Sequence, residues 1–361
     1  MVKTVIMKKD GTIKVQEQPY PNLESGAVLV KTAYSEVCGT DVHLRKGHLA
    51  DVPYPIIPGH VSTGTIEELN GENYDIDGNK LQEGDPITFL DVHETCNNCW
   101  YCLVAKTSTR CPRRKVYGIT YSSKEGLLGG WSEYIYLKPG VKIIKLPYDE
   151  FMKTFMAAGC GLPTAIHAIE RSEIKLGDTV AIQGSGPVGL MAALLAKLRG
   201  AFHVIMIGGP GHRLKIADYF GIDTTINIKD FDPEARVKQV LEYTNNRGAD
   251  VTIEATGVPT AVKEGLEMTR DGGIYTIVGQ YTNAGEVTIN PHLDVNKKHL
   301  IIKGSWGSDF SHFYLAVELI KRFSPTYPFK NIISREYSLE EAATALDDVE
   351  HLRVMKAIIK P

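Results

Sequence analysis

Hydrophobic and polar residues follow different patterns in the two parts of the chain. In the first 150 residues, short alternating or β-branched runs are separated by glycine, proline and polar turns. The clearest of these runs are residues 13–16, 27–34, 64–66 and 84–89. Many short strands with turns between them predict a small β-barrel-like domain.

From about Asp178, apolar strand runs alternate with segments of helical periodicity. The predicted strands are residues 178–183, 203–207, 225–228, 250–254 and 273–278. The four predicted helices lie between consecutive strands, near residues 187–199, 213–220, 234–244 and 260–268. This alternation predicts a doubly wound parallel sheet, so the fold class is α/β. The C-terminal part adds a strand at 300–305, a helix at 310–322, a helix start with a capping-box pattern at 338–342 and a closing strand at 355–359.

The composition is that of an ordinary globular protein. Hydrophobic residues make up 43% and charged residues 23% of the 361 residues, a length that favours two domains. The net charge of −3 and the scattered positive charges argue against nucleic acid or a membrane surface as a partner. The N-terminus becomes charged too early for a signal peptide. We therefore expect a cytoplasmic protein whose six cysteines are reduced.

Four cysteines stand close together in a short polar stretch. Cys96, Cys99, Cys102 and Cys111 have spacers of two, two and eight residues, which is typical of a tetrahedral all-thiolate zinc site. Four thiolates leave no open position, so the predicted role of this zinc is structural. An iron–sulfur cluster or four free thiols are the alternatives, and elemental analysis separates them.

The pattern Gly-x-Gly-x-x-Gly stands between a predicted strand and a predicted helix, the context in which it indicates a dinucleotide-binding turn. Gly184 permits the tight turn, Gly186 lets the backbone approach a pyrophosphate, and Gly189 lets helix and strand pack closely. An acidic residue is expected at the end of the second strand, but Gly208 stands there. Because Arg213 follows and no carboxylate repels a 2′-phosphate, both NAD and NADP stay open.

A short run near the N-terminus concentrates side chains that bind metals and move protons. It holds Cys38, Thr40, Asp41 and His43, and His60 follows in a glycine-flanked turn. A thiolate and an imidazole can hold a metal, and a hydroxyl and a second imidazole can carry a proton. Each of these residues taken alone is more often a core or surface residue without chemistry.

With this run, the four-cysteine loop and the dinucleotide turn in one chain, the sequence resembles the zinc-containing alcohol dehydrogenases of the medium-chain dehydrogenase/reductase family. The resemblance covers nearly the whole chain. It implies a GroES-like catalytic domain formed by residues 1–155 and 298–361, with a Rossmann domain inserted at 156–297. It also implies a homo-oligomer, a dimer or a tetramer, with a small-molecule alcohol or carbonyl compound as substrate.

The resemblance implies two zinc ions in each chain, one structural and one catalytic. The catalytic ion would be held by Cys38 in a C-G-x-D-x-H pattern, by His60 in G-H-x-x-x-G and by Cys160 in G-C-G-x-x-T. Two thiolates and one imidazole leave the fourth position open for water or substrate. Asp41 would orient a ligand imidazole, most naturally that of His60.

The resemblance also implies a mechanism. Zinc would act as a Lewis acid on the alcohol, and the nicotinamide of NAD or NADP would accept a hydride. Thr40 would take the proton of the alcohol, the nicotinamide ribose would pass it on, and His43 would deliver it to solvent. The residues implied to contact the dinucleotide are Gly184, Gly186, Pro187, Val188, Gly189, Gly208, Arg213, Thr164, Val278 and Gly279.

Besides Gly208, two further features depart from the family pattern. Val61 stands where the family usually has a glutamate close behind the zinc. We therefore expect no acidic group behind the metal and slower ligand exchange there. The spacer of eight residues before Cys111 is one longer than the usual seven, which a loop absorbs.

The function predicted in this way is an NAD(P)-dependent zinc alcohol dehydrogenase that acts on a primary or secondary alcohol, or on the corresponding carbonyl compound. A polyol, amino-alcohol or formaldehyde-adduct dehydrogenase on the same scaffold is one alternative. A non-catalytic zinc- and nucleotide-binding protein is an alternative of a different class. The complete set of ligand and relay residues argues against it.

Overall fold

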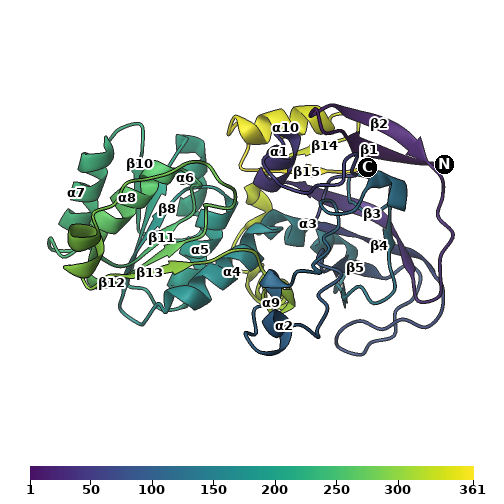
Figure 1. Cartoon of the computed structure of the whole chain (residues 1–361), viewed down its shortest axis with the longest axis horizontal. Helices are drawn as coiled ribbons and strands as arrows, with labels where there is room; N and C mark the ends of the chain where they lie inside the picture. Colours follow the sequence, from purple (N-terminus) through teal and green to yellow (C-terminus); the bar gives the residue numbers. More distant parts are fainter. The chain divides into compact units, whose positions relative to one another are not determined.

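The computed structural model describes residues Met1–Pro361, which form two compact units. Unit 1 consists of Met1–Cys160, Asp309–Lys321 and Phe329–Pro361, and unit 2 of Gly161–Ser308 and Arg322–Pro328. In Figure 1, unit 1 carries the purple N-terminal and yellow C-terminal segments, and unit 2 is mostly teal and green. The domain boundaries implied by the family resemblance, with a Rossmann domain at 156–297, remain a prediction.

Unit 1 is built on one mixed sheet. Its strands are β3 (Val28–Val37), β4 (Ser62–Leu69), β5 (Pro86–Phe89), β6 (Tyr134–Leu137), β7 (Ile143–Lys145), β14 (Ile333–Tyr337) and β15 (Lys356–Ile359). They follow the order β14-β15-β3-β4-β5-β7, and β6 pairs with β3. β1 (Val2–Met7) and β2 (Ile13–Gln18) form a separate antiparallel pair. Because β15 lies antiparallel to β3, the C-terminal strand runs beside the segment that leads to Cys38.

Unit 1 also contains short helices and loops. The helices are α1 (Gly39–Arg45), α2 (Trp100–Leu103), α3 (Asp149–Ala158), α9 (Phe310–Phe323, which ends in unit 2) and α10 (Ala342–Glu350), with 3-10 turns at Ser108–Arg110, Ser123–Glu125 and Phe329–Ile332. One core of unit 1 is a cluster of apolar residues from several strands. Val30, Ile87, Phe89 and Ile135 are each at most 1% exposed.

Unit 2 is a six-stranded parallel sheet with helices. Its strands are β8 (Thr179–Gln183), β9 (His203–Gly208), β10 (Thr224–Asn227), β11 (Ala249–Glu254), β12 (Thr269–Ile277) and β13 (Ile301–Gly304). Its helices are α4 (Gly161–Ser172), α5 (Pro187–Leu198), α6 (Gly211–Asp218), α7 (Pro233–Tyr243) and α8 (Pro259–Met268), with a π-helical turn at Pro291–Asn296. The strand order β10-β9-β8-β11-β12-β13 is that of a doubly wound dinucleotide fold, which confirms the predicted α/β class.

The central strand and its helix show why the sequence folds in this way. Val180, Ala181 and Ile182 of β8 are fully buried, as expected for a parallel strand covered on both faces. α5 starts at Pro187, a position where the missing N–H of proline leaves no hydrogen bond unmade. The strand order reverses next to β8, and this is where open α/β sheets bind ligands.

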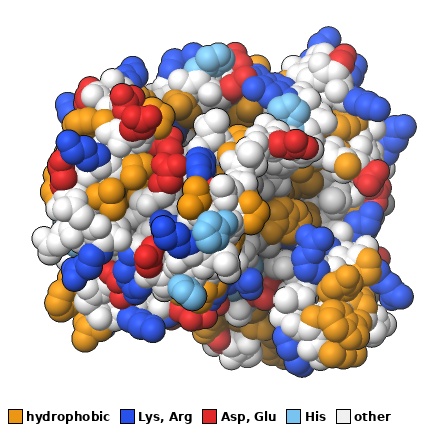
Figure 2. Space-filling model, turned by 60° about the vertical axis from the view of Figure 1, so that its left-hand side comes forward, with side chains coloured by type: hydrophobic (Ala, Val, Ile, Leu, Met, Phe, Trp, Pro, Cys, Tyr) orange, Lys and Arg blue, Asp and Glu red, His pale blue; other side chains and the backbone are white.

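Several elements differ from the sequence prediction, and three of them lie near the site or at the C-terminal end. The helices α3 and α4, on either side of Cys160, were not predicted. α10 begins at Ala342 rather than at Ser338, because residues 338–341 form a turn in which the Ser338 N–H donates to the Glu341 carboxylate at 3.0 Å. None of the helices combines the length and the apolarity needed to cross a bilayer. On the face drawn in Figure 2, positive and negative side chains are interspersed, in keeping with the scattered charges of the sequence.

Candidate active site and metal centres

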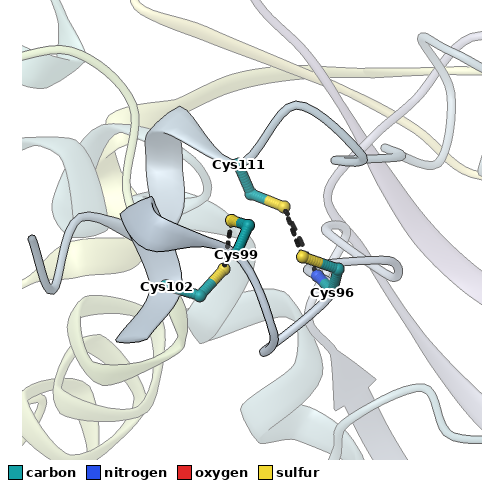
Figure 3. Close-up of side chains that lie close together, drawn as sticks. All are labelled: Cys96, Cys99, Cys102 and Cys111. Carbon is teal, nitrogen blue, oxygen red and sulfur yellow. Dashed lines mark hydrogen bonds between the residues drawn. The ribbon is translucent and has the colours of Figure 1, made fainter. Parts of the chain in front are cut away.

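Four cysteine sulfurs converge in the loop after β5. Cys96, Cys99, Cys102 and Cys111 place their Sγ atoms within 4.8 Å of one another and point toward a common centre (Figure 3). The Cys99–Cys102 and Cys96–Cys111 Sγ pairs are each 3.5 Å apart, whereas a disulfide bond is about 2.05 Å long. All four are free thiols, so the arrangement fits a closed tetrahedral zinc site.

Backbone N–H groups donate hydrogen bonds to sulfurs of this cluster, which favours the thiolate form that binds a metal. Cys99 precedes α2 at the N-cap position without a capping hydrogen bond from its side chain, and the N–H of Cys96 donates to Cys111 Sγ at 3.4 Å. The backbone N–H of Asn98 is the main cause that lowers the pKa of Cys96 to about 7. The loop buries little apolar surface of its own, since Trp100 is 62% exposed. A bound metal is therefore what can order it.

We expect Cys99→Ser to release one zinc ion per chain and to loosen the loop. Three thiolates hold zinc more weakly than four, and the loop has no apolar core to replace the metal. Elemental analysis should show one zinc instead of two, and limited proteolysis should cut between residues 96 and 111. Ser108→Ala in the same loop is the control and should keep both ions. Iron in place of zinc in the unmodified protein would contradict the assignment.

A second cluster joins three distant parts of unit 1. Cys38 follows β3, His60 precedes β4, and Cys160 follows α3. The ligand atoms of these three residues lie within 4.8 Å of one another. His60 is 6% exposed, and both cysteines are partly exposed free thiols. The structure thus brings together the three residues that the resemblance implied as ligands of the catalytic zinc.

Asp41 fixes the start of α1 at this cluster. Its Oδ2 accepts a hydrogen bond from the Cys38 N–H at 2.9 Å, and the Cys38 sulfur accepts one from the Thr40 N–H at 3.3 Å. This is a reciprocal capping box that orients Cys38. No hydrogen bond joins Asp41 to His60, the imidazole that it was expected to orient. Asp41 Oδ1 and His60 Nδ1 are both buried without a hydrogen-bond partner.

The surroundings of the second cluster favour a cation. Burial alone would lower the pKa of His60, but Cys160, Asp41 and Asp91 outweigh it and raise that pKa to about 10. The pKa of Cys160 is lowered, mainly by a hydrogen bond from Cys38, and the pKa of Cys38 is raised in turn. Two thiols and an imidazole in anionic surroundings are a zinc donor set. The residues therefore fit a zinc ion with three protein ligands.

An acidic group does lie beside one of these ligands, although position 61 does not provide it, and the expected effect of Val61 on ligand exchange stays a prediction. Val61 is 2% exposed and apolar, as the sequence shows. However, β3 contributes Glu36, whose Oε1 lies 3.3 Å from Cys160 Sγ and whose Oε2 accepts from the Cys160 N–H at 2.6 Å. Sequence reasoning missed this residue. A buried acid two positions before a ligand cysteine was the available signal.

His43 lies on α1, one turn after Thr40, and faces a second histidine. Its Nδ1 is 3.2 Å from Nδ1 of His48, which is exposed just beyond the end of α1. Burial is the main cause that lowers the pKa of His43, and the charges of His48 and Lys46 add to it. His43 is therefore neutral at neutral pH and able to accept a proton. His48 was not among the predicted residues.

The three turn glycines of unit 2 differ in the space around them. A Cβ on Gly184 would lie 2.6 Å from Ala255 O, and its φ is +114°. A Cβ on Gly189 would lie 2.0 Å from Gly184 O. At Gly186 the nearest atom would be Arg213 Nη1 at 3.9 Å, so this glycine faces open space. Gly184 and Gly189 are therefore required for close backbone packing, and Gly186 leaves room for a ligand.

The end of β9 packs against the same turn. A Cβ on Gly208 would lie 2.5 Å from Ser185 Oγ, so no acidic side chain fits at this position. Ser185 Oγ accepts from the Gly209 N–H at 2.9 Å and donates to Gly209 O at 3.1 Å. Arg213, on α6, is 7% exposed, and burial lowers its pKa to about 10. It remains a cation near the turn.

Glu254 shapes the neighbouring loops at the end of β11. This fully buried carboxylate accepts from the backbone N–H groups of Thr256 at 2.6 Å, Gly257 at 2.8 Å and Gly279 at 3.0 Å. It thereby fixes the loop after β12, where Val278 and Gly279 were predicted to contact the cofactor. Sequence reasoning gave Glu254 no role. The other two predicted contacts, Thr164 and Val188, lie on the packed helices α4 and α5.

Two protein-family models match the chain. The model described as "Alcohol dehydrogenase GroES-like domain" matches residues 24–148, and the model described as "Zinc-binding dehydrogenase" matches residues 187–322. The chain is 32% identical over 359 residues to 5-exo-hydroxycamphor dehydrogenase of Pseudomonas putida, covering 99% of this chain and 98% of that protein. It is 31% identical over 343 residues to D-arabinitol dehydrogenase 1 of Uromyces fabae, covering 94% and 92%.

Solved structures give the same result. An alcohol dehydrogenase from Thermotoga maritima superposes with a TM-score of 0.93 at 35% identity, covering 100% of this chain and 99% of that one. A zinc-binding dehydrogenase from Sinorhizobium meliloti, bound to NADP, superposes with a TM-score of 0.86 at 26% identity and the same coverage. Together with the fold, these similarities show that the chain belongs to the zinc-dependent alcohol dehydrogenases of the medium-chain dehydrogenase/reductase family, oxidoreductases that act on CH–OH groups with zinc and NAD(P).

Proposed function

We propose that this protein interconverts a secondary alcohol and the corresponding ketone at a zinc ion held by Cys38, His60 and Cys160. The observation that carries the proposal is the convergence of these three ligand atoms within 4.8 Å. The names of its relatives support the substrate class, because hydroxycamphor and the 3-position of threonine carry secondary hydroxyl groups. Zinc at this position supplies Lewis acidity that polarises the substrate oxygen.

The test is a panel of primary alcohols, secondary alcohols and polyols with both cofactors, followed by the near-ultraviolet absorbance of the reduced nicotinamide. We expect the highest kcat/KM with secondary alcohols. Turnover of primary alcohols alone would contradict the substrate class. Two bound zinc ions without turnover of any alcohol or carbonyl compound would favour a binding protein.

We propose that Thr40, His43 and His48 carry the proton between substrate and solvent. Thr40 and His43 are three residues apart on α1, so their side chains lie on one face of the helix. His43 is half-buried, and His48 is exposed. The 3.2 Å contact between their Nδ1 atoms lets one ring hold a proton that the other accepts. The arrangement leads from the interior of unit 1 to its surface.

We expect His43→Ala to lower kcat for alcohol oxidation by about tenfold or more near pH 6, and by less than about threefold near pH 9. At high pH, hydroxide replaces the imidazole as the proton acceptor. Because the pKa of His43 lies below its usual 6.5, the unmodified enzyme keeps its activity until the pH falls below that lowered value. A pH series of kcat with imidazole as a rescuing buffer measures this.

The neighbours of His43 provide the controls for this pH series. We expect His48→Ala to show a smaller loss with the same pH dependence. Lys46→Met removes a charge that lowers the pKa of His43 but no proton carrier, so it should leave kcat near pH 9 unchanged and move the fall in kcat at low pH to a higher pH. A parallel drop in kcat at all pH values in His43→Ala would contradict the relay.

For the cofactor, we propose that both NAD and NADP are used. Gly208 places no carboxylate against a 2′-phosphate, and Arg213 adds a buried positive charge near the turn. We therefore expect kcat/KM values for the two cofactors within about 100-fold of each other. Steady-state kinetics with each cofactor measures this ratio, and strict use of one of them would contradict it.

We also propose a cytoplasmic location and a homo-oligomer, a dimer or a tetramer. The six free cysteines, all in two metal-ligand clusters, support a reducing compartment. Light scattering coupled to size-exclusion chromatography determines the oligomeric state, and a monomer would contradict it.

A further inference from the structure

A buried ion pair lies beside the catalytic ligand cluster. Glu36 and Lys356 are each 1% exposed, and Lys356 Nζ donates to Glu36 Oε1. Glu36 is on β3, two residues before Cys38, and it stands opposite Ile358 of the antiparallel strand β15. Because side chains alternate along a strand, Lys356 lies on the same face of the sheet as Glu36. An N-terminal strand and the C-terminal strand therefore lie side by side next to the ligands.

The ion pair holds the backbone on both sides of Gly159. Glu36 Oε2 accepts from the Cys160 N–H at 2.6 Å, and Lys356 Nζ donates to Ala158 O at 3.3 Å. The turn that ends α3 and presents Cys160 is thus anchored at two points. A third contact joins Glu36 Oε1 to Cys160 Sγ at 3.3 Å.

Gly159 shows how closely the turn fits this pair. Its φ is +47°, in the left-handed region, and a Cβ there would lie 2.1 Å from Glu36 Oε2 and 2.4 Å from Lys356 Nζ. Only glycine leaves room for both charged groups. The position of Cys160 is therefore set by the ion pair and not by α3 alone.

The backbone of Glu36 connects the same pair to the other two ligands. Its N–H donates to Val61 O at 3.0 Å, next to His60, and its carbonyl accepts from Trp131 Nε1 at 2.9 Å. Cys38 follows two residues later on the same strand. Glu36 therefore contacts the segments that carry Cys160 and His60, and it lies on the same segment as Cys38.

The positive charge of Lys356 offsets the negative charges of Glu36 and of a Cys160 thiolate. A bound zinc ion needs Cys160 as a thiolate, and the contact with Glu36 Oε1 then joins two negative charges. The ammonium of Lys356 on the same oxygen offsets this repulsion. Burial opposes a charged lysine, but Glu36 and Cys160 outweigh it and raise the pKa of Lys356. The ammonium of Lys356 therefore offsets the charge of Glu36, and the two thiolates balance the charge of a divalent cation.

We propose that the Glu36–Lys356 pair positions Cys160 for the catalytic zinc and balances the charge of the ligand set, so that it controls how long the metal is retained. This inference rests on the proposed zinc site. It assigns to β3 and β15 the acidic support that the position after His60 does not provide. Glu36 and Lys356 act through Cys160 and are positioning residues.

The test is the release of zinc from the holoenzyme to an excess of chelator, followed for both ions. Cys38→Ala, which should keep only the structural ion, assigns the two kinetic phases. We expect Lys356→Met and Glu36→Gln to release the catalytic zinc at least about tenfold faster, with the structural phase unchanged. Lys356→Arg keeps the charge and should stay within about threefold of the unmodified protein.

Two further variants separate positioning from general stability. The double variant Glu36→Gln/Lys356→Met buries no unpaired charge, and we expect it to release zinc faster than the unmodified protein but more slowly than Lys356→Met. It decides the test if Lys356→Met does not fold. Arg236→Met removes a similar ion pair in unit 2, with Glu264 at 2.7 Å, and should change neither phase.

Release of the catalytic zinc at the unmodified rate in the double variant, or equal acceleration of both phases, would overturn the inference. A protein that binds two zinc ions and shows the expected release rates, yet oxidises no alcohol, would contradict the proposed function and leave this inference standing.

Discussion

Cys38→Ala is expected to remove the catalytic zinc and to lower kcat/KM by about 10⁴-fold or more. Lewis-acid stabilisation of the substrate oxygen is worth several kcal/mol, and each ~1.4 kcal/mol corresponds to a factor of ten. Cys38 supplies one of two thiolates, and it is also the residue that the capping box with Asp41 orients. Alanine removes the ligand and leaves His60 and Cys160, which are too few for stable binding.

Metal content and activity must fall together for this prediction to hold. Elemental analysis should change from two zinc ions per chain to one, while the thermal unfolding temperature changes little, because the four-cysteine site is untouched. Cys38→Ser is the matched control for size and should behave like alanine. Retention of both ions, or a kcat/KM within about tenfold of the unmodified enzyme, would show that Cys38 is not a ligand.

The parts of the structure that local patterns describe could be predicted from the sequence. The spacing of Cys96, Cys99, Cys102 and Cys111 places four thiols in one short loop, and the structure brings them within 4.8 Å. The strand, glycine turn and helix around Gly186 form a continuous segment as well. In both cases the residues that interact are close in sequence, so the chain between them limits where they can lie.

The second cluster could not be derived in this way. Cys38, His60 and Cys160 lie on separate segments, and only the family resemblance indicated that they belong together. Glu36 and Lys356 are 320 residues apart and share no local pattern. Their contact depends on β15 pairing with β3, which is a property of the complete sheet. The valine at position 61 therefore gave no indication that Glu36 lies beside Cys160.

The missed helix α3 did carry a local signal. Asp149 and Glu150 lie in its first turn, where negative charge stabilises a helix, and Gly159 ends it. The apolar residues between them lie between the two regions whose patterns were interpreted, and they were assigned to no element. Recognising this helix would have placed Cys160 just beyond its end.

The dinucleotide turn allows a sharp separation of ligand binding from folding. We expect Gly186→Ala to weaken NADH binding by about 30- to 100-fold, equivalent to about 2–3 kcal/mol, without loss of stability. The new methyl group meets no protein atom closer than Arg213 Nη1 at 3.9 Å, so unit 2 accepts it. It occupies the space through which the backbone is expected to approach the pyrophosphate. Quenching of protein fluorescence by NADH measures the affinity.

Gly189→Ala is the matched variant, with the same added atom at the other end of the turn. Its Cβ would lie 2.0 Å from Gly184 O, a backbone atom that cannot turn away as a side chain could. We expect a fall of several degrees in the thermal unfolding temperature, since forced backbone shifts cost about 1–3 kcal/mol. Zinc content should stay at two ions in both variants. Only Gly189 lacks room for a Cβ within the protein. Equal effects of the two alanine substitutions on stability would therefore contradict the separate roles of Gly186 and Gly189.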